Sequence, residues 1–590
     1  MSAKRSLLSE LKRRKVFRVG AAYLVVGWLL IQVASTVAPQ LNLPGWVPRA
    51  ITFLIAIGFP IALILSWIFD VGPGGIHREA TGVESASSAS ADVVSASASP
   101  AADIGTAPEI PHKSIAVLPF ADLSPTRDQE YFSDGMAEEI LNALVKLKDL
   151  KVAGRTSSFF FKGKNEDLRG IGKTLSVAHV LEGSVRKHGD KVRITAQLIR
   201  TDNGYHLWSE SYDGELSDVF ELQERIARAI VRELDVILHG DQQQRLVPVA
   251  TQNPEAYELY LQAGDIFNRR DGTRLAKAIE MLHKATFLDP HFARAYARLA
   301  TIHALEPIYT PSLVDAAAEA VRREATRAGE IDPALGEPHS AIALVSLQEH
   351  RFVESREAID RALTLQPGDP TIGYWFGAIS ISTGYIAQGC SQLDRVLQAD
   401  PLYPIALLWR GTQYVQAGDL NRGMALLQKS VDTGLTHAWL GMHEVTAASG
   451  RTEEATAQLA RGLTALGAGL PDGAPEILAR AVYGDAAARA QGLAVVDQFL
   501  ASLPRVLPGA LPYTLLLMGD GPRALDLCQR FRSTNNVMYL HRLWSPSLRA
   551  LRGTAQFRTF TRSVGLTALW DHHGAPDGAR RNAGGEYVWE

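Results

Sequence analysis

Residues 366–401, QPGDPTIGYWFGAISISTGYIAQGCSQLDRVLQADP, carry the pattern that decides the fold of this chain. The stretch opens on Gln366-Pro367 and closes on Asp400-Pro401, and Asp332-Pro333 stands one equal step earlier, about 34 residues back. Proline cannot continue a helix, so each of these dipeptides indicates a helix end. A period of this length is typical of helix–turn–helix units that bury their apolar faces by stacking. We therefore predict an all-α solenoid.

Smaller residues recur in the same register. Five residues before each proline stand Ala285, Ala328, Ala362 and Val396, and the first helices carry Ala300, Ala343, Gly377 and Gly411 where helices would cross closely. A further dipeptide, Asp289-Pro290, precedes Asp332-Pro333 by a longer step, and the excess falls in Glu306–Pro311, where two prolines predict an open loop. The spacing resembles the tetratricopeptide repeat (TPR) family over roughly 253–467. An irregular helical array with accidental spacing is the alternative.

Length and composition limit the classes of protein. A chain of 590 residues is too long for one core, so several units are expected. A net charge of −3 gives no electrostatic reason to bind nucleic acid. The two cysteines, Cys390 and Cys528, lack CxxC spacing, which argues against a disulfide scaffold and a cysteine metal site.

The N-terminal region contains two apolar runs. Residues 19–38 and 50–69 are each long enough to cross a bilayer as a helix, and 1–18 is basic, which favours a cytoplasmic N-terminus. A signal peptide is disfavoured because Pro39 follows the first run directly. We predict a transmembrane hairpin in the bacterial inner membrane with the lipid bilayer as partner, an Ala/Ser-rich linker over 79–112, and soluble domains in the cytoplasm.

A mixed α/β domain is expected over 113–240. A buried strand at 114–120 is followed by a helix capped at Ser133-Asp134, a strand at 151–153 and a short helix at 168–175. Turn residues then separate three antiparallel strands, and a helix after Ser217-Asp218 closes the domain. The three strands are predicted at 180–186, 191–200 and 205–212. The whole fold is thus a transmembrane hairpin, a small α/β domain with an antiparallel meander, and an all-α TPR solenoid.

Four runs carry a resemblance to a known family. They are FSDGMAEEILNAL (132–144), RTSSFFFKGK (155–164), AHVLEGSVRKHGDKVRITAQLI (178–199) and GYHLWSESYDGELSDVFELQERIA (204–227). Together they resemble the TolB-like amino-terminal (FlgO-like) domain of bacterial membrane-anchored proteins with TPR repeats. In that group the domain is sometimes coupled to a nucleotide cyclase or a winged-helix domain, neither of which is expected in this chain.

Two segments of the α/β domain suggest anion binding. Basic and hydroxyl side chains flank three phenylalanines at 159–161; these side chains are Arg155, Ser157, Lys162 and Lys164. They could hold an anion or an acidic peptide. The alternative is a solvated loop. The run Gly170–Thr174 ends like a phosphate loop, but Asp167 stands where the first glycine is needed, so we reject this match.

No catalytic, cofactor or metal residue is predicted. No GxSxG or HExxH pattern occurs. His572-His573 lacks a third ligand at helical spacing, which is more typical of a surface pair than of a metal site.

The predicted concave face of the solenoid is the better candidate for function. Apart from Glu337 it carries mostly uncharged residues: Arg294, Thr301, Leu344, Thr371, Tyr374, Ile405, Leu408 and Thr412. This favours an apolar or amphipathic protein segment as partner, with Tyr374 as anchor. Alternatively these positions pack against the helices of 468–590, an extension and cap in which Trp544, Leu548, Phe557 and Trp570 would cover the last repeat.

These observations favour a non-enzymatic scaffold that binds protein partners through the solenoid and the α/β domain, with self-association left open. One alternative is a sensor whose α/β domain binds a small ligand. Another is an accessory subunit of a separate enzyme such as a nucleotide cyclase.

Overall fold

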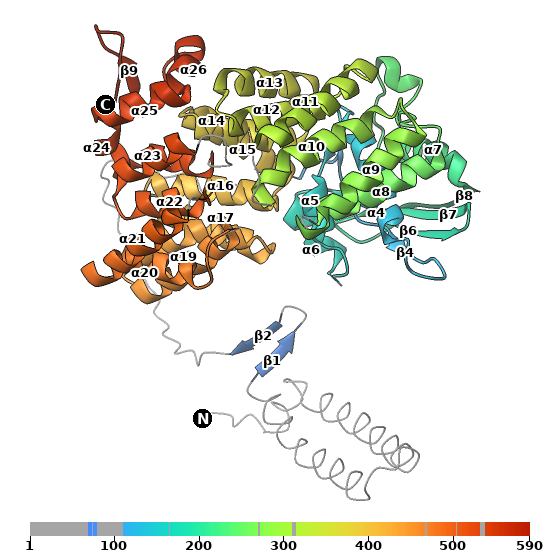
Figure 1. The fold of residues 1–590 in the computed structure, drawn as a ribbon. Coiled ribbons are helices and arrows are strands. Elements are labelled where there is room, and N and C mark those ends of the chain that lie inside the picture. The colour runs from blue at the N-terminus through green and yellow to red at the C-terminus, as the bar shows by residue number, and fades with distance from the viewer. Residues whose placement is uncertain are drawn as a thin grey trace, which may run out of the picture. The chain divides into compact units, whose positions relative to one another are not determined.

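The computed structural model describes residues 69–72, 75–78 and 110–589, except 165, 270–271, 310–313, 467–468, 503, 505 and 532–536. Residues 110–589 form a small mixed-sheet domain followed by a TPR-like helical solenoid (Figure 1). Both belong to one compact unit, whereas residues 69–78 belong to a separate unit. The combination of an α/β domain and a helical solenoid agrees with the sequence prediction.

The membrane prediction needs correction. In the part of the chain that the structure describes, no helix is both long and apolar enough to span a bilayer, which contradicts the predicted two-span inner-membrane localisation. The segments 1–18 and 19–68 and most of the linker lie outside the described residues. Phe69, the expected last residue of the second span, instead begins strand β1 (Phe69–Gly72), which pairs antiparallel with β2 (Gly75–Arg78).

The domain sheet has the order β5-β3-β6-β7-β8, with β4 also paired to β6. Its strands are β3 (Ser114–Val117), β4 (Ala121–Asp122), β5 (Lys151–Val152), β6 (His179–His188), β7 (Lys191–Arg200) and β8 (His206–Glu215). The first four form parallel pairs, and β6, β7 and β8 form the antiparallel meander that the turn signals predicted. The sequence-based strand boundaries are therefore close to the observed ones.

Four helices accompany the sheet: α4 (Glu130–Val145), α5 (Arg155–Phe159), α6 (Leu168–Leu175) and α7 (Val219–Glu233). Helix α4 begins before the predicted cap, so Ser133 is buried inside the helix rather than at its start. Helix α7 follows Ser217-Asp218 as predicted and ends at Glu233, and Ile237 beyond its end is 64% exposed. Gly170–Thr174 lies within α6, so it does not form a phosphate loop.

The solenoid is built from antiparallel helix pairs. In order they are α8 (Pro254–Asn268) with α9 (Leu275–Leu288), α10 (Ala293–Tyr309) with α11 (Val314–Ile331), α12 (Glu337–Gln348) with α13 (Phe352–Leu365), α14 (Pro370–Ser382) with α15 (Ile386–Ala399), and α16 (Pro404–Gln416) with α17 (Leu420–Asp432). The predicted register holds: the four residues placed five before each proline are all buried. At Gly377 an added Cβ would lie 2.8 Å from Leu393 Cγ and 3.2 Å from the carbonyl of Gly389, so this crossing requires glycine.

The predicted loop at Glu306–Pro311 is wrong over most of its length. Helix α10 continues through Pro307 to Tyr309, and the excess residues lengthen α10 and α11 instead. A proline near the C-terminal end of a helix removes one backbone hydrogen bond and is tolerated there more readily than in the middle.

The array continues beyond residue 432 and then folds back. The further helices are α18 (Trp439–Ala448), α19 (Thr452–Leu466), α20 (Ala474–Tyr483), α21 (Ala486–Ala501), α22 (Ala510–Leu517), α23 (Gly521–Arg530), α24 (Arg549–Arg552), α25 (Ala555–Val564) and α26 (Leu566–His573), with a 3₁₀ segment η5 (Val537–Trp544) and a hairpin of β9 (Ala579–Arg581) and β10 (Tyr587–Trp589). The indole N–H groups of Trp544 and Trp570 donate to the carbonyls of Ser382 and Thr383. The predicted cap therefore covers the α14–α15 turn in the middle of the array.

Candidate functional site

The α/β domain is joined to the solenoid through helix α5. The carboxylate of Asp400, just after α15, accepts hydrogen bonds from the backbone N–H of Ser157, at 2.8 Å, and from its hydroxyl. The Ser157 hydroxyl oxygen accepts in turn from the N–H of Leu402 at 2.7 Å. Gly154 donates its N–H to the carbonyl of Ala399. Asp400 thus occupies the N-terminal end of α5, where free N–H groups and the helix dipole favour a negative charge.

Burial of Asp400 is almost complete, with 1% of its surface exposed. Burial raises the pKa of this carboxyl group, while the hydrogen bonds from Ser157 and Thr156 favour the charged form and act in the opposite direction. The contact between Asp400 and α5 is therefore buried away from water. The charged form of the Asp400 carboxylate depends on the hydrogen bonds from Ser157 and Thr156.

The predicted anion-binding residues all have partners within the chain. Ser157 binds Asp400, Arg155 pairs with Glu138 at 2.6 Å, and Lys162 pairs with carboxylates of α4. The Lys164 ammonium lies over the Phe160 ring, 2.9 Å from its centroid. The sequence thus pointed to a segment that does hold a carboxylate, although that carboxylate belongs to the solenoid. Binding of an external anion stays a prediction.

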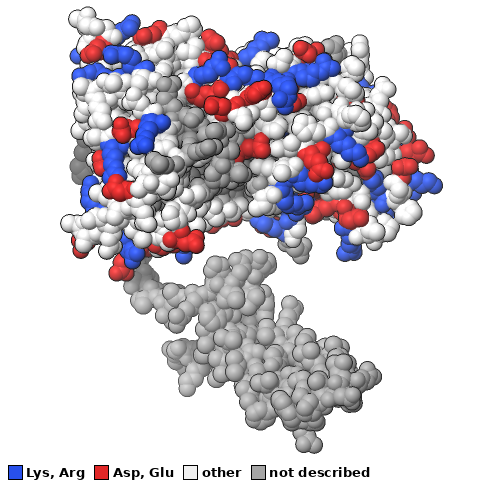
Figure 2. Space-filling model, viewed as in Figure 1, with Lys and Arg blue, Asp and Glu red and all other residues white. Residues whose placement is uncertain are grey.

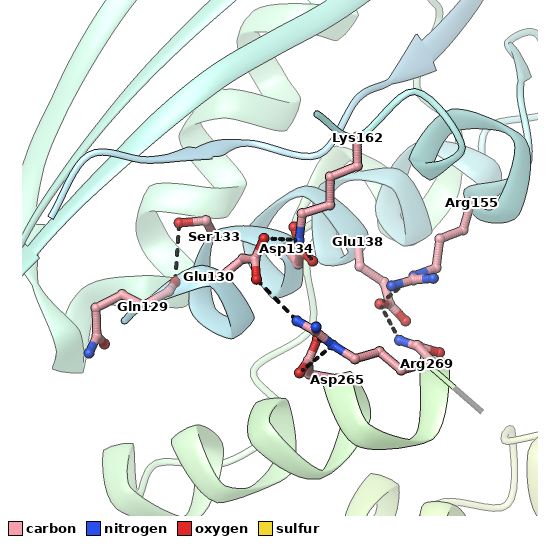
Figure 3. Close-up of polar contacts among 10 residues, drawn as sticks. Gln129, Glu130, Ser133, Asp134, Glu138, Arg155, Lys162, Asp265 and Arg269 are labelled. Atoms are coloured by element: carbon pink, nitrogen blue, oxygen red, sulfur yellow. Dashed lines mark hydrogen bonds and ion pairs between the residues drawn. The ribbon is translucent and has the colours of Figure 1, made fainter. Parts of the chain in front are cut away.

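Helix α4 presents three carboxylates toward α5 and α8 (Figure 3). Glu130 lies 2.8 Å from Lys162 and 3.1 Å from Arg269 of the α8 end. Asp134 lies 2.5 Å from Lys162. Burial alone would raise the pKa of Glu138. The positive charges of Arg155 and Arg298 and the hydrogen bond from the Asn268 amide have the opposite effect and together lower this pKa below its usual value. Each of these three carboxylates therefore has a basic side chain as its partner.

A buried ion pair connects α4 with α10. Arg294 Nη1 lies 2.6 Å from Glu139, and the two side chains are 19% and 5% exposed. One helical turn further along α10, Arg298 lies 3.0 Å from Glu337, which also accepts a hydrogen bond from Thr301 at 3.1 Å. Arg294 and Thr301, predicted to bind an outside partner, are thus engaged inside the molecule.

A small cavity lies between the two domains. A cavity of about 20 Å³, with room for about one water molecule, lies among side chains of α4, α5, α8 and α10. Asp134 lines this cavity, its Oδ1 atom is buried with no hydrogen-bond partner among the described residues, and burial raises the pKa of this carboxyl group. This cavity is too small for a metabolite.

The remaining predicted groove residues are mostly buried. Leu344, Tyr374, Leu408 and Thr412 are each less than 9% exposed, whereas Thr371 and Ile405 are partly exposed. The Tyr374 ring packs against Trp375 and Tyr403, with centroids 4.7 and 5.8 Å apart. These ring contacts of Tyr374 lie within the repeats rather than with the helices of 468–590. The role of the predicted groove residues in binding a partner is untested.

The C-terminal segment contributes to this packing. The Trp409 ring of α16 lies 5.1 Å from the His541 ring of η5. The Tyr513 hydroxyl donates to the carbonyl of Leu440 at 3.1 Å. The C-terminal segment thus contacts helices α16 and α18 of the array.

A wider groove opens at the first repeat. It has a volume of about 620 Å³ and is lined by 249–254 and by Leu288, Asp289 and His291. Phe287, the neighbour of Leu288 on α9, is 84% exposed, and Val249 is 47% exposed. Sequence analysis missed this groove because Phe287 resembles other apolar positions of the repeat, and the sequence does not show that it is exposed.

Surface charge is mixed. On the face shown in Figure 2, basic and acidic side chains are interspersed over the described part of the chain. The absence of nucleic acid among the partners stays a prediction.

The family model that matches covers residues 111–229 and describes the second domain of HilA/YgeH-like transcriptional regulators. It spans the α/β domain for which the sequence suggested a TolB-like family, and the TolB-like assignment stays a prediction. A curated relative, a putative adenylate cyclase 3 of Rhizobium meliloti (strain 1021), is 40% identical over 196 residues. That match covers 33% of this chain and 33% of the relative, so the chain spans about a third of that protein.

Three solved structures have helical arrays similar to parts of this chain. The Pseudomonas aeruginosa PilF structure is 16% identical, with 36% of this chain and 93% of that chain covered and a TM-score of 0.28. YrrB, a TPR protein with an unusual peptide-binding site, is 17% identical, with 33% and 92% covered and a TM-score of 0.22. The Cut9–Hcn1 structure is 14% identical, with 60% and 59% covered and a TM-score of 0.33.

Proposed function

We propose that this chain is a non-enzymatic protein-interaction scaffold. The observation that carries the proposal is the docking of the α/β domain on the solenoid through Asp400 and Arg294, which are held by Ser157 and Glu139. Because these contacts occupy α8, α10 and the α15–α16 turn, the two domains act as one platform. A partner therefore binds a surface that this docking leaves open.

The groove at the first repeat is the surface that suits a protein partner. It lies at the end of the solenoid, where α8 and α9 have no preceding repeat among the described residues. Its lining contains no lysine or arginine, so it offers no attraction for an acidic segment. Val249 of the lining and Phe287, which adjoins the lining residue Leu288 in sequence, are exposed and suit an apolar side chain of an extended or helical peptide.

Site-specific crosslinking tests this proposal. A photo-crosslinking amino acid placed at Phe287 in living cells should give a discrete adduct that mass spectrometry identifies. The matched control carries the same amino acid at Leu207, which is 41% exposed on β8. Phe287→Ser should then weaken binding of the identified protein in purified form by at least about tenfold, since buried aromatic anchors dominate interface energies. Equal adducts at both positions would argue against the groove.

A second candidate function rests on the relative named as a putative adenylate cyclase. Under this second proposal the chain is an accessory subunit, and the nucleotide cyclase is on another polypeptide. Affinity-purified chain from its native cells should then form cyclic AMP from ATP, while the recombinant chain alone should not. An inactive native eluate would count against the accessory role. Activity of the recombinant chain would overturn the non-enzymatic assignment itself.

The sensor alternative has less support from geometry. The cavity of about 20 Å³ beside α4 is too small to hold a metabolite, and the larger groove lies outside 113–240. A small ligand in the α/β domain would need a pocket of a few hundred Å³.

A further inference from the structure

Three potential metal ligands from distant parts of the sequence meet on the surface of the solenoid. His572 and His573 end helix α26, and Glu357 lies opposite them on α13. One ligand atom from each residue falls within 4.8 Å of the other two. The Nε2 atom of His572 is 3.5 Å from Glu357 Oε1. Helix α26 itself offers no third ligand at helical spacing. The third ligand is Glu357, which comes from α13.

The donor set suits one class of ion. Two imidazole nitrogens and one carboxylate oxygen form a combination that binds Zn²⁺, with water in the fourth position. Metal–ligand distances of about 2.1 Å place the ligands of a tetrahedral site about 3.3 Å apart. The Glu357–His572 pair is close to this value, and Glu357 and His572 are exposed enough for small rotations to close the remaining distances.

The backbone around the histidines is held in place. The Trp570 indole donates to the carbonyl of Thr383 at 2.9 Å, and the Tyr385 hydroxyl donates to the carbonyl of Gly574 at 2.8 Å. Gly574 has φ +95°, which allows the chain to turn directly after the histidine pair. The cluster therefore does not sit on a loose chain end.

One ring nitrogen of His573 is unsatisfied among the described residues. His573 Nε2 is buried and has no hydrogen-bond partner in the described part of the chain, an arrangement that calls for an explanation. The neighbouring cation Arg356 is paired with Asp360, at 2.9 Å, which reduces its repulsion of a metal ion. A bound cation would give the Nε2 atom of His573 a partner.

We propose that Glu357, His572 and His573 bind a divalent transition-metal ion, Zn²⁺ by its donor chemistry, and that this ion fastens α26 to α13. The three ligands then connect the C-terminal segment to the middle of the solenoid. Because two of the three ligands are exposed, binding is reversible and chelators remove the ion.

The test uses the full chain, freed of metal with a chelator and titrated with Zn²⁺ against a chromophoric competitor. The unmodified chain should bind one equivalent, and Glu357→Gln and His572→Ala should each weaken this binding at least about tenfold. His206→Ala, at an exposed position at the start of β8, is the matched control and should bind as the unmodified chain does.

A second readout is the melting temperature. Zn²⁺ should raise the Tm of the unmodified chain and of the control, because a ligand that binds only the folded state stabilises it. It should not raise the Tm of the two site variants. The proposal is overturned if no stoichiometric binding is found, or if the site variants match the control.

Discussion

The carboxylate of Asp400 caps helix α5 by accepting hydrogen bonds from the N–H and hydroxyl groups of Ser157, which lies in a different domain. Asp400 also belongs to the series of Asp-Pro turns that sets the repeat period. One turn of the solenoid thus ends a repeat and anchors the α/β domain. The interface depends on this residue more than on the equivalent turns.

Asp400→Ala should destabilise the interface by about 1–3 kcal/mol, since it leaves buried donors of α5 without an acceptor. The matched control is Asp332→Ala, because the Asp332 side chain accepts from the nearby N–H of Ala334. Thermal unfolding followed by limited proteolysis should show earlier release of 113–240 in the Asp400 variant. If the two variants release this segment together, the capping contact does not hold the domains.

Gly154→Ala should disrupt the same contact by steric overlap. A Cβ at Gly154 would overlap the side chain of Asp400, and forced overpacking costs about 1–3 kcal/mol. Gly170→Ala is the control, since no atom lies within 4 Å of the added Cβ and alanine favours the helix. Melting temperatures should fall for the first variant and stay level or rise for the second. The reverse order would contradict the close approach.

Local pattern was sufficient to predict most elements of the fold. Strict alternation defined β7 to the residue, and the proline steps defined the ends of α13 and α15, because both signals are periodic along the chain. Helix α10 escaped prediction at Pro307, where tertiary packing overrides the local preference for a break. The return of Trp570 to Thr383 was also invisible, since no periodic signal links such distant positions.

The candidate site was only partly predictable for the same reason. The residue types around Ser157 suggested an anion site or a solvated loop, but the sequence could not show that Asp400 of the same chain binds there. Arg294 looked like a free groove residue because sequence alone does not show that Glu139 lies against it. Residue chemistry indicates what a side chain can bind, and the fold decides which partner reaches it.

Removing one member of the buried pair Arg294–Glu139 should cost about 3–5 kcal/mol, because an unpaired charge remains in the interface. Arg294→Ala and Glu139→Gln should each lower stability, and the double variant should lose much less than the sum of the two. A double-mutant cycle of unfolding free energies measures this coupling. Additive losses would indicate that the two side chains act independently.

Stability should fall on mild acidification because of His443 in α18. Burial, reinforced by Arg542 and opposed by Glu444, lowers the pKa of His443 to about 4. The Tyr483 hydroxyl lies 2.5 Å from its Nδ1 atom. Between pH 6.5 and about 4 the unfolded chain takes up a proton here and the folded chain does not, so the loss from this residue reaches about 3 kcal/mol at the acid end.

His443→Gln removes this titration and should flatten the fall in melting temperature between pH 7 and pH 5. His206→Gln, at an exposed position on β8, serves as the matched control. The comparison uses the slope rather than the absolute melting temperature, because the substitution also changes the contact with Tyr483. An unchanged slope in the His443 variant would mean that the folded chain protonates this imidazole as readily as the unfolded chain does, and that α18 admits water around it.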